Sequence, residues 1–71
     1  MHSIRILRLT GERRVEYIRT ELEKKTPRSL RKIMKAYGVI DKELAKAEMV
    51  DFLTASLLDW AHRIELGFWR H

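Results

Sequence analysis

The residues best suited to a chemical role are basic side chains gathered between positions 28 and 35. They are Arg28, Arg31, Lys32 and Lys35. No acidic residue occurs between Lys24 and Ile40, so the positive field of this stretch is not neutralised by its neighbours in sequence. A dense set of cations is the electrostatic footprint of a surface that contacts phosphates. We therefore expect this stretch to face a polyanion, and nucleic acid is the polyanion that such a footprint suits best.

The net charge of +5 is spread unevenly over the 71 residues. Residues 1–37 hold eleven Lys or Arg against four Asp or Glu, a net +7, and residues 38–71 hold four against six, a net −2. This asymmetry predicts that one half of the chain meets an anionic partner and that the other half has a different role. The basic residues expected to help the central four are Arg13, Arg14, Lys24, Lys25 and Lys46.

The elements that must position these cations are helices. Thr26 is suited to an N-cap and Pro27 to the first helical position, and Gly38 is suited to the left-handed residue after a helix end. An apolar stripe recurs at helical spacing between them, and the basic residues occupy the remaining surface. Its members are Leu30, Ile33, Met34 and Tyr37. The pattern predicts a helix over residues 27–37.

Two further helices are expected, over residues 12–25 and 46–66, so the fold class is all-α: a small three-helix domain with a long C-terminal helix. If the last helix begins near Lys46, the side chain of that lysine can extend into solvent. A helix that began earlier would place Lys46 on the apolar face. Gly67 is expected to end it. Residues 1–11 are predicted to be a short strand or an extended arm, with a frayed helix start as the alternative.

The C-terminal helix carries more apolar surface than a compact three-helix monomer needs. The residues expected at an interface with a partner or a second copy are Phe52, Leu58, Trp60, Phe68 and Trp69. This surplus predicts a homo-oligomer, such as a dimer, or a protein partner that covers the helix.

Residues 29–53 resemble a known unit. Leu30 near the start of a short helix, the pair Gly38-Val39, Leu44 in a loop, and Lys46-Ala47-Glu48-Met49-Val50 with Leu53 occupy its pattern. This is the helix–extended-loop–helix unit of SAP and LEM domains and of the N-terminal domain of the transcription terminator Rho. SAP and Rho members bind DNA or RNA and LEM domains bind a protein, so the resemblance implies a nucleic-acid-binding module.

Two other arrangements use the same residues. A helix-turn-helix from Ile33 to Val50 would present its second helix to DNA, but that helix is acidic. A ribbon–helix–helix dimer would use residues 5–9 as its strand, but their apolar pattern alternates imperfectly.

Catalytic and metal chemistry are not expected. The chain has no Cys, its three His are scattered, and no nucleophile with a base and an orienting group can be assembled, so we expect no enzyme, metal or cofactor. With no secretory or membrane-spanning segment in the sequence, a cytoplasmic protein is expected. The sequence thus predicts a small DNA-binding regulatory module of phage or plasmid type, DNA being favoured over RNA. The alternative is a protein-interaction module that uses the C-terminal helix.

Overall fold

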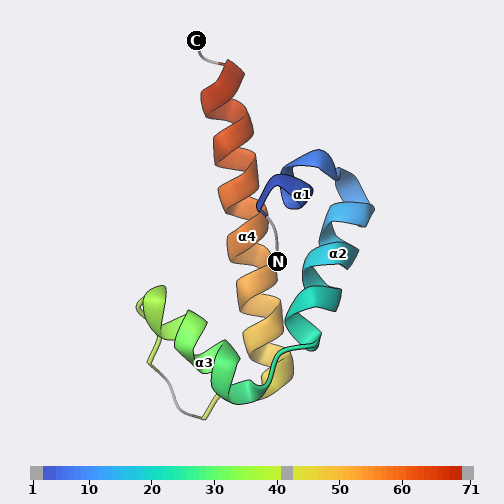
Figure 1. Ribbon diagram of the computed structural model, residues 1–71. Helices are drawn as coiled ribbons and strands as arrows, with labels where there is room; N and C mark the ends of the chain where they lie inside the picture. The colour runs from blue at the N-terminus through green and yellow to red at the C-terminus, as the bar shows by residue number, and fades with distance from the viewer. Residues whose placement is uncertain (1–2, 41–42, 70–71) are drawn as a thin grey trace.

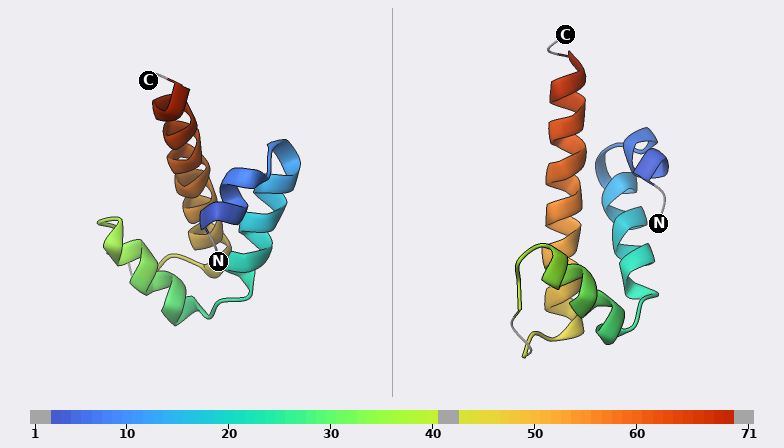
Figure 2. Two further views of the ribbon diagram at one scale, coloured as in Figure 1. Left: turned by 45° about the horizontal axis from the view of Figure 1, so that its top comes forward. Right: turned by 60° about the vertical axis from the view of Figure 1, so that its left-hand side comes forward.

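The computed structural model describes the backbone of residues 3–40 and 43–69, and the side-chain surroundings of residues 4–40 and 43–67. Four helices occur in the described ranges, and no strand does: α1 (Ser3–Arg8), α2 (Gly11–Glu23), α3 (Pro27–Ala36) and α4 (Lys46–Trp69). Helices α2 and α4 lie side by side, α1 folds across one end of this pair, and α3 crosses the other end (Figures 1 and 2). The expected all-α fold with a long C-terminal helix is confirmed.

The expected strand or arm over residues 1–11 is wrong for the part that the structure describes, because Ser3–Arg8 is a helix, α1. A lone strand would leave its backbone groups unpaired, whereas a helix pairs them within itself. The adjacent pair Ile6-Leu7, which breaks a strand alternation, suits this helix, since Ile6 is buried and Leu7 packs beside it. The ribbon–helix–helix arrangement loses its strand with this correction. Residues 1 and 2 of the expected arm lie outside the described residues.

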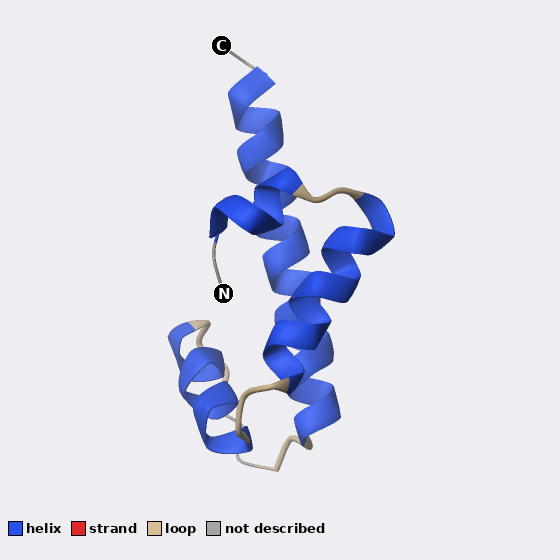
Figure 3. Cartoon of the chain, turned by 45° about the vertical axis from the view of Figure 1, so that its right-hand side comes forward, coloured by secondary structure: helices blue, strands red, loops and turns tan. Residues whose placement is uncertain are grey.

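The core extends along the α2–α4 pair, with α1 packed at one end and α3 at the other. Its fully buried apolar residues are Ile6 from α1, Ile18 and Leu22 from α2, Leu30 and Met34 from α3, and Met49, Val50, Leu53 and Ala61 from α4. Helix α4 contributes more of them than any other helix because it packs against both α2 and α3 (Figure 3). Burial of these side chains supplies the main driving force for a domain this small.

Both ends of α3 are fixed by the residues that the sequence indicates. The Thr26 hydroxyl accepts a hydrogen bond from the backbone N–H of Ser29 at 3.2 Å, and Pro27 takes the first turn. At the other end Gly38 has φ +83°, its N–H donates to Lys35 O, and the N–H of Val39 donates to Met34 O, both at 3.0 Å. This pair of bonds is a Schellman motif. The α3 prediction is therefore confirmed to within a residue at its C-terminal end.

Helix α4 begins at Lys46, as expected, but runs to Trp69 and is not ended by Gly67. Glycine inside a helix costs only about 1 kcal/mol, and Gly67 does not adopt the positive φ that ends α3 at Gly38. A helix of 24 residues is about 36 Å long. Its last turns consequently project beyond α1 and α2 (Figure 1).

A buried arginine joins α1, α2 and α4. Arg14 of α2 is only 8% exposed. Its Nε donates to the carbonyl oxygens of Ile6 at 2.8 Å and Leu9 at 2.7 Å, and its Nη2 donates to Leu7 O at 3.3 Å. The same guanidinium forms an ion pair with Glu65 of α4. Arg14 therefore satisfies the C-terminal carbonyls of α1, which have no partner within the helix.

Replacing Arg14 with Ala should lower the free energy of unfolding by about 2–4 kcal/mol, because it leaves buried carbonyls and Glu65 without their charged partner. Arg13→Ala is the matched control, since this neighbouring arginine is exposed and its loss should change stability by no more than about 0.5 kcal/mol. Urea unfolding followed by far-ultraviolet circular dichroism measures both. Equal stabilities of the two variants would contradict the role given to Arg14.

Candidate nucleic-acid interface

The exposed face of α3 is the strongest candidate site. Leu30 and Met34 are buried against the core, and this fixes which side of the helix turns outward. The four cations on that outward side follow the i, i+3, i+4, i+7 spacing of one helix face. They are Arg28, Arg31, Lys32 and Lys35, all exposed. None of the four has an ion-pair partner within the described residues, so their charge is directed to solvent.

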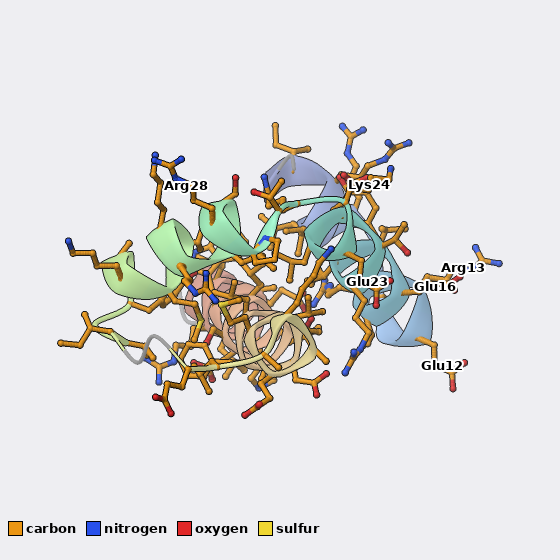
Figure 4. All side chains as sticks on the ribbon, turned by 90° about the horizontal axis from the view of Figure 1, so that it is seen from below. Glu12, Arg13, Glu16, Glu23, Lys24 and Arg28 are labelled. Carbon is orange, nitrogen blue, oxygen red and sulfur yellow. The ribbon has the colours of Figure 1, made fainter. Side chains whose placement is uncertain are left out.

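Two more of the expected cations border this face. Lys24 and Lys25 lie in the short connection between α2 and α3. The Lys24 side chain is 67% exposed and its Nζ lies 3.4 Å from Glu21 Oε1, a surface pair that contributes little to stability. Lys24 and Arg28 lie at the same, upper side of the molecule in Figure 4. We call α3 with these two lysines the α3 basic face.

Arg14 and Arg13 do not belong to the α3 basic face. Arg14 was expected to contact nucleic acid, but its guanidinium is buried and satisfied by three carbonyls and Glu65, so it is not available to a ligand. Arg13 is exposed but lies near the start of α2, about 16 Å along the helix from Lys24. Figure 4 shows it beside Glu16 at the right-hand edge of the molecule, away from Arg28.

Lys46 has a structural contact of its own. Its Nζ donates to the backbone carbonyl of Glu23 at 2.7 Å and so joins the start of α4 to the end of α2. A cation at this place also suits the negative end of the α2 dipole. The Lys46 side chain was expected to extend into solvent at the start of its helix. It is exposed, as expected, and its ammonium group also links α4 to α2.

The residues expected at a partner interface are divided by the structure. Leu58 and Trp60 are half-buried and pack against the core of their own chain. Phe52 is exposed, and its ring meets Tyr37 edge to face with centroids 6.4 Å apart. The side chains of Phe68 and Trp69 lie outside the described part of the chain. The exposed apolar side chains near the projecting end of α4 are Ile64 (45%) and Leu66 (48%), which were not among the residues expected at a partner interface.

The sequence reasoning also missed Arg5 and Arg8, because residues 1–11 were expected to be a strand or arm. Both are exposed on α1 and line one shallow hollow with Ile4 and Leu9. The guanidinium carbon of Arg5 lies 5.7 Å from the centroid of the Tyr17 ring on α2. A cation–π contact of this kind holds an arginine in place without neutralising its charge.

The described residues contain no group of three or more His, Asp or Glu that could hold a metal ion. No helix among them is both long and apolar enough to cross a bilayer. Residues 37–45 separate α3 from α4, a longer connection than the tight turn of a helix-turn-helix, and Glu48 and Asp51 are exposed on the second helix.

Two exposed lysines should separate the effects of folding from those of ligand contact. Lys46→Met should lower the free energy of unfolding by about 1 kcal/mol through loss of the bond to Glu23. If the α3 basic face binds DNA, Lys46→Met should leave DNA affinity close to wild type, whereas Lys32→Met should lower DNA affinity and leave the free energy of unfolding unchanged. Urea unfolding and fluorescence anisotropy with labelled DNA measure the two quantities. An affinity that falls equally in both variants would place Lys46 in the interface after all.

Searches of protein-family models, of curated proteins and of solved structures find no match to this chain. The function of the protein is therefore inferred from the placement of its exposed charges.

Proposed function

We propose that the protein binds nucleic acid, DNA in preference to RNA, through the α3 basic face and acts as a small regulatory module. The observation that carries this proposal is a set of four exposed cations on one face of α3, without ion-pair partners in the described part of the chain. Cations that are already paired must give up a partner to bind phosphate. These four have none to give up, so their contacts with phosphate are not opposed by an internal contact.

Three features support phosphate contact. The charges repeat along one helix face, so they can meet successive phosphates of a backbone. The N-terminus of α3 carries the positive end of the helix dipole beside Arg28. The binding face is rigid, because Thr26 and Gly38 fix the two ends of α3 and Leu30 and Met34 anchor its underside. A rigid cationic face binds with little ordering cost.

The order of the elements from α3 to α4 supports the helix–extended-loop–helix resemblance as part of this proposal. Gly38 follows α3, Leu44 is half-buried in the connection, and Lys46 opens α4. Helices α1 and α2 and the distal half of α4 lie outside the unit. In this interpretation these helices support the unit by packing against it. They have no counterpart in the family pattern.

Binding to DNA should weaken steeply as salt is raised, since each phosphate contact releases counterions. Arg31→Gln combined with Lys32→Gln should lower affinity on the order of 10- to 100-fold at moderate salt and reduce the slope of log K against log salt by about two. Fluorescence anisotropy over a salt series measures both.

The matched control is Arg19→Gln combined with Arg63→Gln. It removes the same charge from residues paired with Asp51 and Asp59, away from α3. This control should bind nearly as the wild type does. The proposal would be abandoned if DNA binding were absent even at low salt, or if the α3 variant and the control bound DNA alike.

A protein-interaction module is the second candidate function. The observation that favours it is the projecting end of α4, where Ile64 and Leu66 remain about half exposed (Figure 2). Apolar side chains exposed on a helix that extends past its own domain are suited to a partner helix or a second copy. On this alternative the basic half would raise the rate of association with a partner rather than bind nucleic acid.

Self-association through this end of α4 should give a molar mass that rises with protein concentration in light scattering. Ile64→Gln combined with Leu66→Gln should remove the rise by making the exposed surface polar, with DNA affinity unchanged. A monomer at every concentration of the wild-type protein would exclude self-association.

A further inference from the structure

A second basic cluster lies on α1, at the other end of α2 from α3. Arg5 and Arg8 are three residues apart on this helix, both are exposed, and they border the same shallow hollow. Neither has an ion-pair partner among the described residues. Arg5 is also positioned, because its guanidinium lies over the ring of Tyr17. We call these two residues the α1 cluster.

The α1 cluster and the α3 basic face share one side of the molecule. Tyr17 and Lys24 are seven residues apart on or next to α2, close to two full helical turns, so both lie on the same side of that helix. The guanidinium of Arg5, seated over Tyr17, is therefore on the side from which Lys24 projects. Figure 4 shows Lys24 and Arg28 on a common side, with the ribbons of α1 and α3 both above α4.

The acidic residues of α2 mostly avoid this side. Glu12, Glu16 and Glu23 lie to the right of or below Lys24 and Arg28 in Figure 4. Glu21 is the exception, being four residues from Tyr17, but its carboxylate is paired with Lys24. The side that joins the two clusters consequently keeps a positive potential along the length of α2.

The spacing of the two clusters indicates the kind of ligand. Arg5 lies over Tyr17, which is seven residues and about 10 Å along α2 from Lys24, and the four cations of α3 lie beyond Lys24. Phosphates of one strand of B-DNA follow one another at about 3.4 Å along the axis, so about three base pairs span the distance to Lys24 and a longer duplex is needed to reach the cations of α3 as well. A mononucleotide or a free phosphate can touch only one cluster at a time, whereas an extended backbone can touch both.

A duplex fits this side better than a single strand does. Single-strand binders add aromatic side chains on which bases stack. Residues 3–37 contain two aromatic residues, Tyr17 and Tyr37. The ring of Tyr17 lies under Arg5, and Tyr37, which is 47% exposed, has its ring against Phe52 beyond the C-terminal end of α3 rather than among the four cations. A face of cations with no aromatic side chain among them is suited to contact with the phosphate backbone of a duplex.

We propose that the ligand of the α3 basic face is duplex DNA lying along α2, and that Arg5 and Arg8 form a second set of phosphate contacts at its far end. This inference rests on the proposed function of α3. It adds that binding has a minimum length: a duplex shorter than the distance between the clusters gains nothing from α1.

The test uses DNA hairpins, which stay duplex when short, with stems of about 3 and about 14 base pairs, the first too short and the second long enough to reach from α1 to the cations of α3. The full-length protein is compared with Arg5→Gln combined with Arg8→Gln and with Arg31→Gln combined with Lys32→Gln. The control is again Arg19→Gln combined with Arg63→Gln. Arg8→Gln alone leaves the Arg5–Tyr17 contact intact, so it serves as the second α1 variant, and far-ultraviolet circular dichroism checks that α1 stays folded.

The α1 variant should lower affinity for the long stem by about tenfold or more and reduce its salt slope by about two, with no effect on the short stem. Arg8→Gln should give about half of that change in slope. If the α1 variants match the control on the long stem, or weaken both stems equally, the spanning duplex is overturned while the α3 variant can still show DNA binding. If the α3 variant also matches the control, the proposed function itself fails.

Discussion

The contact on which most of the structure depends is that between Arg14 and the end of α1. A helix of six residues is too short to be stable alone, because nucleation costs more than so few hydrogen bonds return. Arg14 meets this difficulty by donating to carbonyls of Ile6, Leu7 and Leu9, which would otherwise be left without donors. Glu65 compensates the buried charge from the far part of α4. One side chain thereby holds three helices, and breaking this contact would leave a charge or several carbonyls buried without a partner.

This network also decides which of the basic residues remain available. In the folded protein Arg14 is buried, and Arg19 forms an ion pair with Asp51 between α2 and α4. Lys46 donates a hydrogen bond to the C-terminal end of α2. The α3 cations receive no such partner, because the helix that carries them is acid-free and its underside is wholly apolar. The number of basic residues in the sequence therefore overstates the number offered to a ligand, and unpaired cations remain on α3 and α1.

Local chemistry explains what the sequence predicts well. The Thr26 cap, Pro27 and the positive φ at Gly38 act within a few residues, so they are legible without knowledge of the fold. The start of α4 at Lys46 follows from the same kind of reasoning about one helix face. The conformation of residues 3–8 was harder to predict, because it depends on a hydrogen-bond donor from elsewhere in the chain, which is Arg14. The role of Arg14 is invisible in sequence for the same reason: its acceptors are backbone carbonyls, and Glu65 lies at the other end of the chain. Gly67 was wrongly expected to end α4, because a glycine ends a helix only where the chain turns and the chain does not turn at Gly67.

The dependence on Arg14 reaches the proposed interface as well. Helix α1 both receives the Arg14 hydrogen bonds and carries Arg5 and Arg8, so the contact that stabilises the fold also fixes the position of the second basic cluster. Two clusters held at a set distance bind an extended ligand more tightly than the same charges on flexible arms, because the ordering cost is met during folding. Helix α1 thus contributes both to the stability of the domain and to the proposed contact with an extended ligand. The proposed preference for an extended polyanion over a compact one would therefore follow from the fixed separation of the α1 cluster and the α3 basic face rather than from the number of charges.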